Sequence, residues 1–381
     1  MRASQISAAL VAALVGYAAS VAIVIAAGQA VGATPAQIVS WVAAVSIAKG
    51  IGSALLSRWT LVPVVLAWST PGAALIATST GISLPQAAGG FFVAGILIFL
   101  TGLLPFLNRW VSAIPMGIAA AMLAGVLLPF VTHVAVTAAD APNLVLPLVA
   151  CFLVVRRIAP LYATLATMAL AIGIAVSSGN SGANIAGQFT LLTFVRPEFT
   201  WAAAIGLGLP LYLVTMASQN LPGFAVMRAN GFTPPTRPAL VVTGLGSALV
   251  AFFGAHTFNM AAITAAICLD PEVEPDRARR WRVGLAYGVI WVAIGLASPL
   301  ILPLIAAIPP ALIGAVAGLA LIGALIGAIT QAYETAATRF PATLTLAVTA
   351  SGTAAFGLGS AFWGLCIGLL ALGLDRLAAK S

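Results

Sequence analysis

The chain has 381 residues, of which 62 % are hydrophobic and 6 % are charged, and its mean hydropathy is +1.13. Soluble domains contain roughly a quarter charged residues, so the composition excludes a soluble globular protein and predicts an all-α polytopic membrane protein. The net charge of +8 comes from basic residues in short loops between apolar runs, which excludes a nucleic-acid-binding surface.

Apolar runs of about 20 residues recur along the chain, long enough to cross a hydrocarbon core of about 30 Å. The first, Ile6–Gly28, is too long for the apolar core of a signal peptide, so we expect a retained span. Hydropathy and helix breakers predict spans at 6–29, 37–56, 63–79, 86–106, 110–130, 140–155, 158–177, 200–227, 238–253, 257–269, 281–297, 300–330, 336–350 and 354–374. Residues 300–330 form either one span or two; counted as one long or bent span, they bring the total to about 14 transmembrane segments, seven in each half.

An odd number of spans per half makes the second half enter the membrane from the opposite side, which is an inverted repeat. With the N-terminus in the cytoplasm, every Lys and Arg except Arg196 falls on or near the cytoplasmic side, Lys49 included. Because cytoplasmic loops are enriched in Lys and Arg, this layout predicts that both termini are cytoplasmic. The charge-dense segment Asp270–Arg282 is expected to be a cytoplasmic connector.

Two apolar segments about half a chain apart, Trp68–Leu75 and His256–Ile263, are broken by polar residues or proline. Paired interrupted segments in two halves are the best sequence pointer to a transporter's binding site. Backbone groups freed by a break are tolerated only where they line a cavity or are buried in protein. The sequence therefore predicts that substrate is bound by Trp68, Ser69, Thr70 and Pro71 of the first break and by His256, Thr257, Phe258 and Asn259 of the second.

All eight acidic residues fall in loops or at the ends of spans. Carboxylates inside a membrane usually mark proton relays or cation sites, so their absence disfavours a cation transporter and favours an anion or a neutral solute. The positive element is then expected to be a helix N-terminus, with its dipole and unpaired N–H groups. Thr70 before Pro71 is expected to cap one such helix, and Thr257 or Asn259 the other.

Two further pairs of polar side chains lie in apolar spans. Gln219 and Asn220 are predicted either to orient the solute or to hydrogen-bond to neighbouring helices, and Tyr17 and Ser20 are predicted to complete the pocket. His256 is either a carrier of a coupling proton or a hydrogen-bonded structural residue. The other histidine, His133, is expected in an external loop.

The three cysteines, Cys151, Cys268 and Cys366, are far apart in the chain and form no CxxC or Cys/His cluster. We therefore expect neither a metal site nor a disulfide framework, and no cofactor. No cluster of His, Asp and Glu or of Ser and His lies within the predicted spans, which disfavours a membrane enzyme.

Several stretches together resemble the benzoate/proton symporter family, BenE. They are Gly16-Tyr17-Ala18-Ala19-Ser20, Ala33-Thr34-Pro35-Ala36-Gln37-Ile38, Ala67-Trp68-Ser69-Thr70-Pro71-Gly72-Ala73-Ala74-Leu75, Met216-Ala217-Ser218-Gln219-Asn220-Leu221-Pro222-Gly223 and Ala261-Ala262-Ile263-Thr264-Ala265-Ala266-Ile267-Cys268. This family in turn resembles nucleobase and sulfate transporters of the seven-plus-seven inverted-repeat fold. The resemblance implies a core domain from 1–108 and 200–298 and a gate domain from 109–199 and 299–381. It also implies short extended pieces in the third and tenth segments.

The activity that the resemblance implies is secondary active, proton-coupled uptake of benzoate or a related aromatic carboxylate across a bacterial inner membrane. Nucleobase transporters of this architecture place acidic residues at the site, and this chain has none at Gln219, Asn220 or the second break. That difference favours a carboxylate substrate. The alternatives are another organic anion, sulfate or a nucleobase on the same fold, or an anion channel. A homodimer is left open.

Overall fold

The computed structural model describes residues 2–104, 115–177, 192–306, 308–356 and 358–378. In chain order the main elements of these residues are α1 (Ala3–Ala18), α2 (Val21–Ala30), α3 (Pro35–Thr60), β1 (Leu66–Trp68), α4 (Thr70–Ala77), α5 (Leu84–Leu103), α7 (Met116–Asp140), α8 (Pro142–Ile158), α9 (Ala163–Ser177), α10 (Trp201–Ala203), α11 (Leu209–Thr215), α12 (Leu221–Ala229), α13 (Thr236–Ala251), β2 (Phe258–Met260), α14 (Ile263–Leu269), α15 (Trp281–Ala306), α16 (Pro310–Ala332), α17 (Arg339–Ala350) and α18 (Ser360–Ala378). Nine helical stretches in the described part are long and apolar enough to cross a membrane. The chain is a multi-pass membrane protein.

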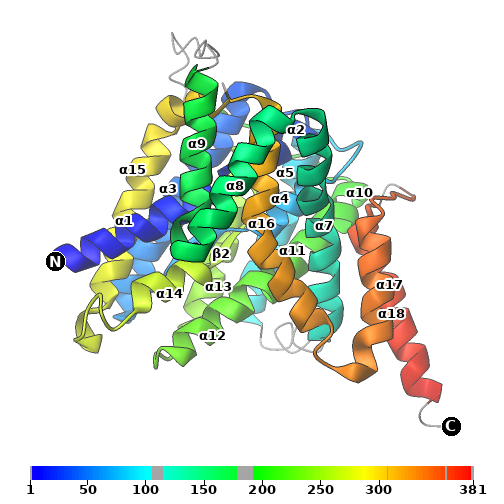
Figure 1. The fold of residues 1–381 in the computed structure, drawn as a ribbon. Helices are drawn as coiled ribbons and strands as arrows, with labels where there is room; N and C mark the ends of the chain where they lie inside the picture. The colour runs from blue at the N-terminus through cyan, green and yellow to red at the C-terminus, as the bar shows by residue number, and fades with distance from the viewer. Residues whose placement is uncertain (1, 105–114, 178–191, 307, 357, 379–381) are drawn as a thin grey trace.

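The long helices pack in two sets. In the first set α3 crosses α15 and α5 crosses α13, with α1, α2, α4 and α14 beside them. In the second set α7 packs on α16 and α17, α17 on α18, and α8 on α9. Figure 1 shows α8, α9 and α16 in front of the rest of the bundle, with α17 and α18 at its right edge.

Glycines allow the two main crossings of the first set to be close. A Cβ added at Gly288 of α15 would clash with the backbone carbonyl of Gly50 of α3. At the other crossing, a Cβ added at Gly244 of α13 would clash with the backbone of Phe99 in α5. Lipid tails are as apolar as the side chains, so burying apolar surface does little to bring helices together in a membrane. Close packing of their backbones at small residues stabilises the association instead.

The expected span 300–330 is wrong at its start. α15 continues to Ala306, and α16 begins at Pro310. A proline disfavours helical backbone at the residue before it, and at the first helical position its missing N–H costs nothing. The helices therefore separate before Pro310, and α15 runs past the domain boundary expected at 298–299.

Two expectations concern the region around α7. The loop position expected for His133 is wrong, because this residue lies inside α7, which extends to Asp140. Pro129 favours a helix end near residue 130, where the span was expected to end. In the structure α7 continues through Pro129. The domain boundary expected at 108–109 lies outside the described residues.

Candidate functional site

The two broken segments meet each other in the interior. β1 and β2 pair in antiparallel register, with Ala67 opposite Asn259. The pairing continues beyond the strands, since Ser69 N donates to Thr257 O and Ala261 N to Val65 O, both at 2.9 Å. Backbone groups freed by each break are thus satisfied by the other, which is how non-helical chain is tolerated at membrane depth. This confirms the short extended pieces expected in both segments.

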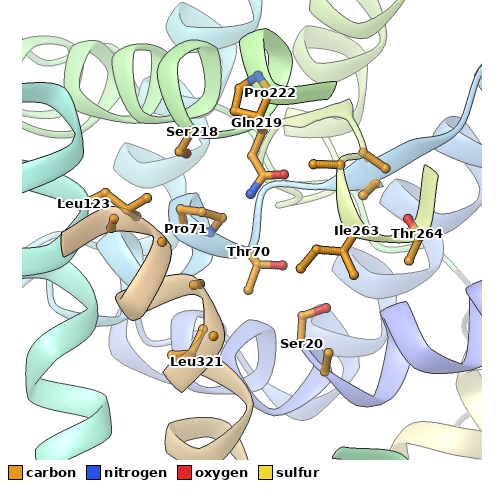
Figure 2. A pocket seen from close by; sticks show the side chains of 18 of the residues that line it. Ser20, Thr70, Pro71, Leu123, Ser218, Gln219, Pro222, Ile263, Thr264 and Leu321 are labelled. Carbon is orange, nitrogen blue, oxygen red and sulfur yellow. The ribbon is translucent and has the colours of Figure 1, made fainter. Parts of the chain in front are cut away.

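A cavity of about 760 Å³ lies beside this crossing. Polar residues that line it include Ser20, Thr70 and Gln219, and much of its apolar wall comes from α7 and α16, including Leu123 and Leu321. In Figure 2 the side chains of Ser20, Thr70 and Gln219 approach one space from three different elements. A largely apolar cavity with a few convergent polar groups is the usual form of a small-molecule site.

Five of the predicted residues line this cavity, and they are Ser20, Trp68, Thr70, Pro71 and Gln219. Ser20 lies where α1 ends and α2 begins, and its hydroxyl links two elements. It donates to the carbonyl of Gly16 and accepts from the indole N–H of Trp68, both at 2.6 Å. Ser20 therefore orients the Trp68 ring that forms part of the wall.

The N-terminus of α4 differs from expectation by one residue. Ser69, and not Thr70, is the cap, because its hydroxyl accepts from the N–H of Gly72 at 3.1 Å. Thr70 is the first helical residue, and its hydroxyl makes no hydrogen bond with any other described residue. The shift leaves Thr70 free to face the cavity, while Ser69 is fully buried behind it.

His256 and Thr257 form buried hydrogen bonds that connect the two broken segments to each other and to neighbouring helices. Trp41 Nε1 donates to His256 Nδ1 at 2.8 Å, and His256 Nε2 lies 3.1 Å from the carbonyl oxygen of Ser69. An indole N–H only donates and a carbonyl only accepts, so the partners select the neutral imidazole with its proton on Nε2. The Thr257 hydroxyl lies 3.0 Å from the Thr215 hydroxyl. The Thr215 hydroxyl in turn donates to the hydroxyl of Ser69. These contacts support a structural role for His256.

The remaining predicted residues are buried around the strands and do not line the cavity. Asn220 Oδ1 accepts from the N–H of Met260 at 3.0 Å, so the amide secures β2. Tyr17 packs against the Trp68 ring, and Phe258 is buried in β2. The side-chain amide of Asn259 has no hydrogen-bond partner among the described residues.

The capping prediction for the second break is wrong. α14 begins at Ile263 after Ala262, which offers no side-chain cap, because Asn259 belongs to the strand and Thr257 precedes it. An extended residue four positions before a helix cannot reach its first-turn N–H groups.

Gln219 lies on a π-helical segment, η3 (Met216–Asn220). Pro222, three residues after Gln219, lacks an N–H and so cannot donate to the regular helical hydrogen-bond ladder, which favours this irregular turn. π-Helical turns recur at functional sites because they redirect side chains. Here the turn directs Gln219 toward Thr70 (Figure 2).

Lys49 lines the cavity although it was not among the predicted site residues. It was expected on the cytoplasmic side, but it lies fully buried within α3 and lines the cavity. The signal was present, since the expected span 37–56 already contained this lysine. Of the described residues that line the cavity, Lys49 and Glu334 are the charged ones, and Glu334 lies beyond the C-terminal end of α16.

Comparisons with known proteins agree with this architecture. The family model "Benzoate membrane transport protein" (BenE) matches residues 1–374. The chain is 40 % identical to "Inner membrane protein YdcO" of Escherichia coli (strain K12) over 357 residues, covering 93 % of this chain and 91 % of the relative. It is 34 % identical to "Benzoate membrane transport protein" of Acinetobacter baylyi over 360 residues, covering 94 % of this chain and 91 % of the relative.

Among solved structures, the fold is similar to the transmembrane domain of a cyanobacterium bicarbonate transporter, BicA. The TM-score is 0.60 at 14 % identity, with 100 % of this chain and 99 % of that chain covered. It is also similar to the murine Slc26a9 anion transporter, with a TM-score of 0.62 at 12 % identity, covering 100 % of this chain and 69 % of that one. The match of the family model over nearly the whole chain, together with both relatives, establishes that the chain belongs to the BenE family of benzoate membrane transport proteins.

Proposed function

We propose that this protein is a secondary active transporter that takes up benzoate or a related aromatic carboxylate, together with a proton, across a bacterial inner membrane. The observation that carries the proposal is the cavity at the strand crossing. There Trp68 and Trp291 contribute to a largely apolar lining together with Leu123 and Leu321, and Thr70, Ser20 and Gln219 offer hydrogen-bonding groups. An aromatic ring with one carboxylate needs this combination. The family and the relative in Acinetobacter baylyi support the choice of benzoate.

The packing supports a core domain and a gate domain that move relative to each other. If the two halves are inverted repeats of seven segments, α3 corresponds to α13 and α5 to α15. The crossing of α3 with α15 then corresponds to that of α13 with α5, and both are extensive contacts. The cavity lies between this set of helices and α7 with α16, where a rocking motion would expose it to alternate sides.

Charged residues at the start of α1 and in the loop before α15 support a cytoplasmic N-terminus. Arg2 pairs with Glu274 at 3.1 Å, and the side chain of Gln5 donates to the same carboxylate at 2.7 Å, so the start of α1 lies against the loop before α15. That loop also carries Arg277 and Arg279, and basic clusters favour the cytoplasmic side. A homodimer stays a prediction, to be measured by mass in detergent.

Uptake of labelled benzoate into proteoliposomes tests the proposal. We expect an inward proton gradient to drive accumulation above the level in protein-free vesicles, which accounts for diffusion of undissociated acid. Unlabelled benzoate should compete, whereas sulfate, bicarbonate and uracil should not.

Two outcomes would contradict the proposal. Competition by one of those other solutes, with none by benzoate, would assign a different substrate to the same fold. Equilibration without accumulation under the imposed gradient would indicate a channel.

A further inference from the structure

Lys49 carries a buried amine without a hydrogen-bond partner in the described part of the chain. It lies in the interior of α3, its side chain is fully buried, and Nζ has no hydrogen-bond partner among the described residues. A buried ammonium is costly unless an anion or several acceptors compensate its charge. Such a group inside a membrane segment is a functional candidate that should have an identifiable partner.

Two indole faces enclose the amine. Nζ lies 3.7 Å from the centroid of the Trp68 ring and 3.1 Å from that of Trp291. Cation–π contacts offset only part of the cost of removing an ammonium from water. All three residues line the cavity, so Nζ lies directly behind the wall that a bound solute contacts.

The ionisable groups around Lys49 provide no counter-charge. They are Tyr17 of α1 and Tyr287 of α15, whose rings pack against Trp291, Cys268 of α14 beside Tyr287, and His256, whose two nitrogens are already hydrogen-bonded. None of these is an acid that is ionised at neutral pH. Glu334, the acid that also lines the cavity, lies beyond the C-terminal end of α16 and forms no hydrogen bond or salt bridge with Lys49. The carboxylate that complements Lys49 is therefore expected to come from a bound solute.

We propose that Lys49 is the residue that binds the carboxylate of the substrate and carries the coupled proton, an inference that rests on the proposed function. In the empty site the amine is neutral. When a carboxylate enters, Nζ takes one proton from the water on that side, and the resulting ammonium pairs with the carboxylate. The loaded site then has no net charge.

After the cavity opens to the other side, the carboxylate leaves and the ammonium releases its proton to water there. The neutral amine returns to its place between Trp68 and Trp291. One carboxylate and one proton have crossed together, and no charge has moved. This explains how a proton is coupled in a chain whose described span interiors offer no carboxylate for the purpose.

Proton uptake on binding tests the inference directly. Benzoate is added to purified protein in weakly buffered solution at neutral pH, with a pH-sensitive dye reporting protons and calorimetry reporting binding. We expect the wild-type protein to take up about one proton per benzoate bound. Lys49→Gln should take up none and bind at least ~10-fold more weakly, because the charged partner is lost.

Two variants serve as controls. Lys49→Arg keeps a positive charge that cannot be lost, so it should bind benzoate without proton uptake. Arg58→Gln removes a cation from the same helix, at an exposed position beside Trp281, and should behave as the wild type.

The outcomes separate the two proposals. Wild-type protein that binds no benzoate contradicts the proposed function. Wild-type protein that binds benzoate without taking up a proton overturns the inference about Lys49 alone, and so does a folded Lys49→Gln protein that binds as tightly as the wild type. A folded Lys49→Gln or Lys49→Arg protein that still takes up one proton per benzoate also overturns it, and where one of these variants does not fold the other decides.

Discussion

The hydroxyl of Thr70 is the most direct test of how the strand crossing binds an anion. Thr70→Val keeps the shape of the side chain and removes one hydrogen-bond donor. The hydroxyl faces the cavity and bonds to no other described residue, and the cap of α4 is supplied by Ser69. The change should therefore leave the free energy of unfolding within about 0.5 kcal/mol of the wild type.

The effect on binding follows from the charge of the ligand. A hydrogen bond to a charged group contributes about 1.5–3 kcal/mol, so losing the one from Thr70 should weaken benzoate binding by about 10- to 150-fold. A neutral solute would lose only about 0.5–1.5 kcal/mol, so the size of the effect also reports whether the bound species is the anion.

Calorimetric titration of purified protein with benzoate measures this change, with thermal unfolding measured on the same samples. Thr78→Val is the matched control, because Thr78 lies just beyond the C-terminal end of the same helix and donates to the carbonyl of Leu75. It should bind benzoate as the wild type does. Wild-type affinity in a folded Thr70→Val protein would refute the placement of the carboxylate at the start of α4.

Two further predictions concern stability, measured by thermal unfolding in detergent. Gly288→Ala should destabilise the fold by about 1–3 kcal/mol, because the new Cβ meets the backbone of α3, whereas Gly373→Ala in α18 has open space and should not. Trp41→Phe should cost about 1–3 kcal/mol by leaving the buried Nδ1 of His256 without its donor, and Trp59→Phe, which is 68 % exposed, should cost little. Unchanged unfolding temperatures in Gly288→Ala or Trp41→Phe would contradict the packing or the hydrogen bond, respectively.

Much of the fold could be predicted because the bilayer restricts the choices. A hydrophobic segment must be helical unless its backbone is satisfied by protein, so the polar interruptions after Trp68 and around His256 had to be unusual. Their pairing as strands agrees with that logic. The limits of single helices were less predictable, since Pro129 continues α7 whereas Pro310 begins α16.

The site was harder to predict because neighbouring polar residues have different roles. Ser69 and Thr70 both suit a helix start, and only the backbone geometry shows which hydroxyl caps the helix and which faces the cavity. His256 stood out as a rare titratable group, yet its nitrogens are occupied by Trp41 and the Ser69 carbonyl. Lys49 was grouped with loop cations because charge counting favours loops.

The sequence by itself determined that the chain crosses a membrane many times, and where its helices are broken, because hydropathy and proline act locally. It also determined that the acidic residues lie outside the interiors of the spans. Only the tertiary structure decided what faces the cavity, because that depends on the angle at which helices from distant parts of the chain cross. Those crossings bring Trp68 of β1 and Trp291 of α15 against Lys49 of α3, a contact that no local pattern specifies.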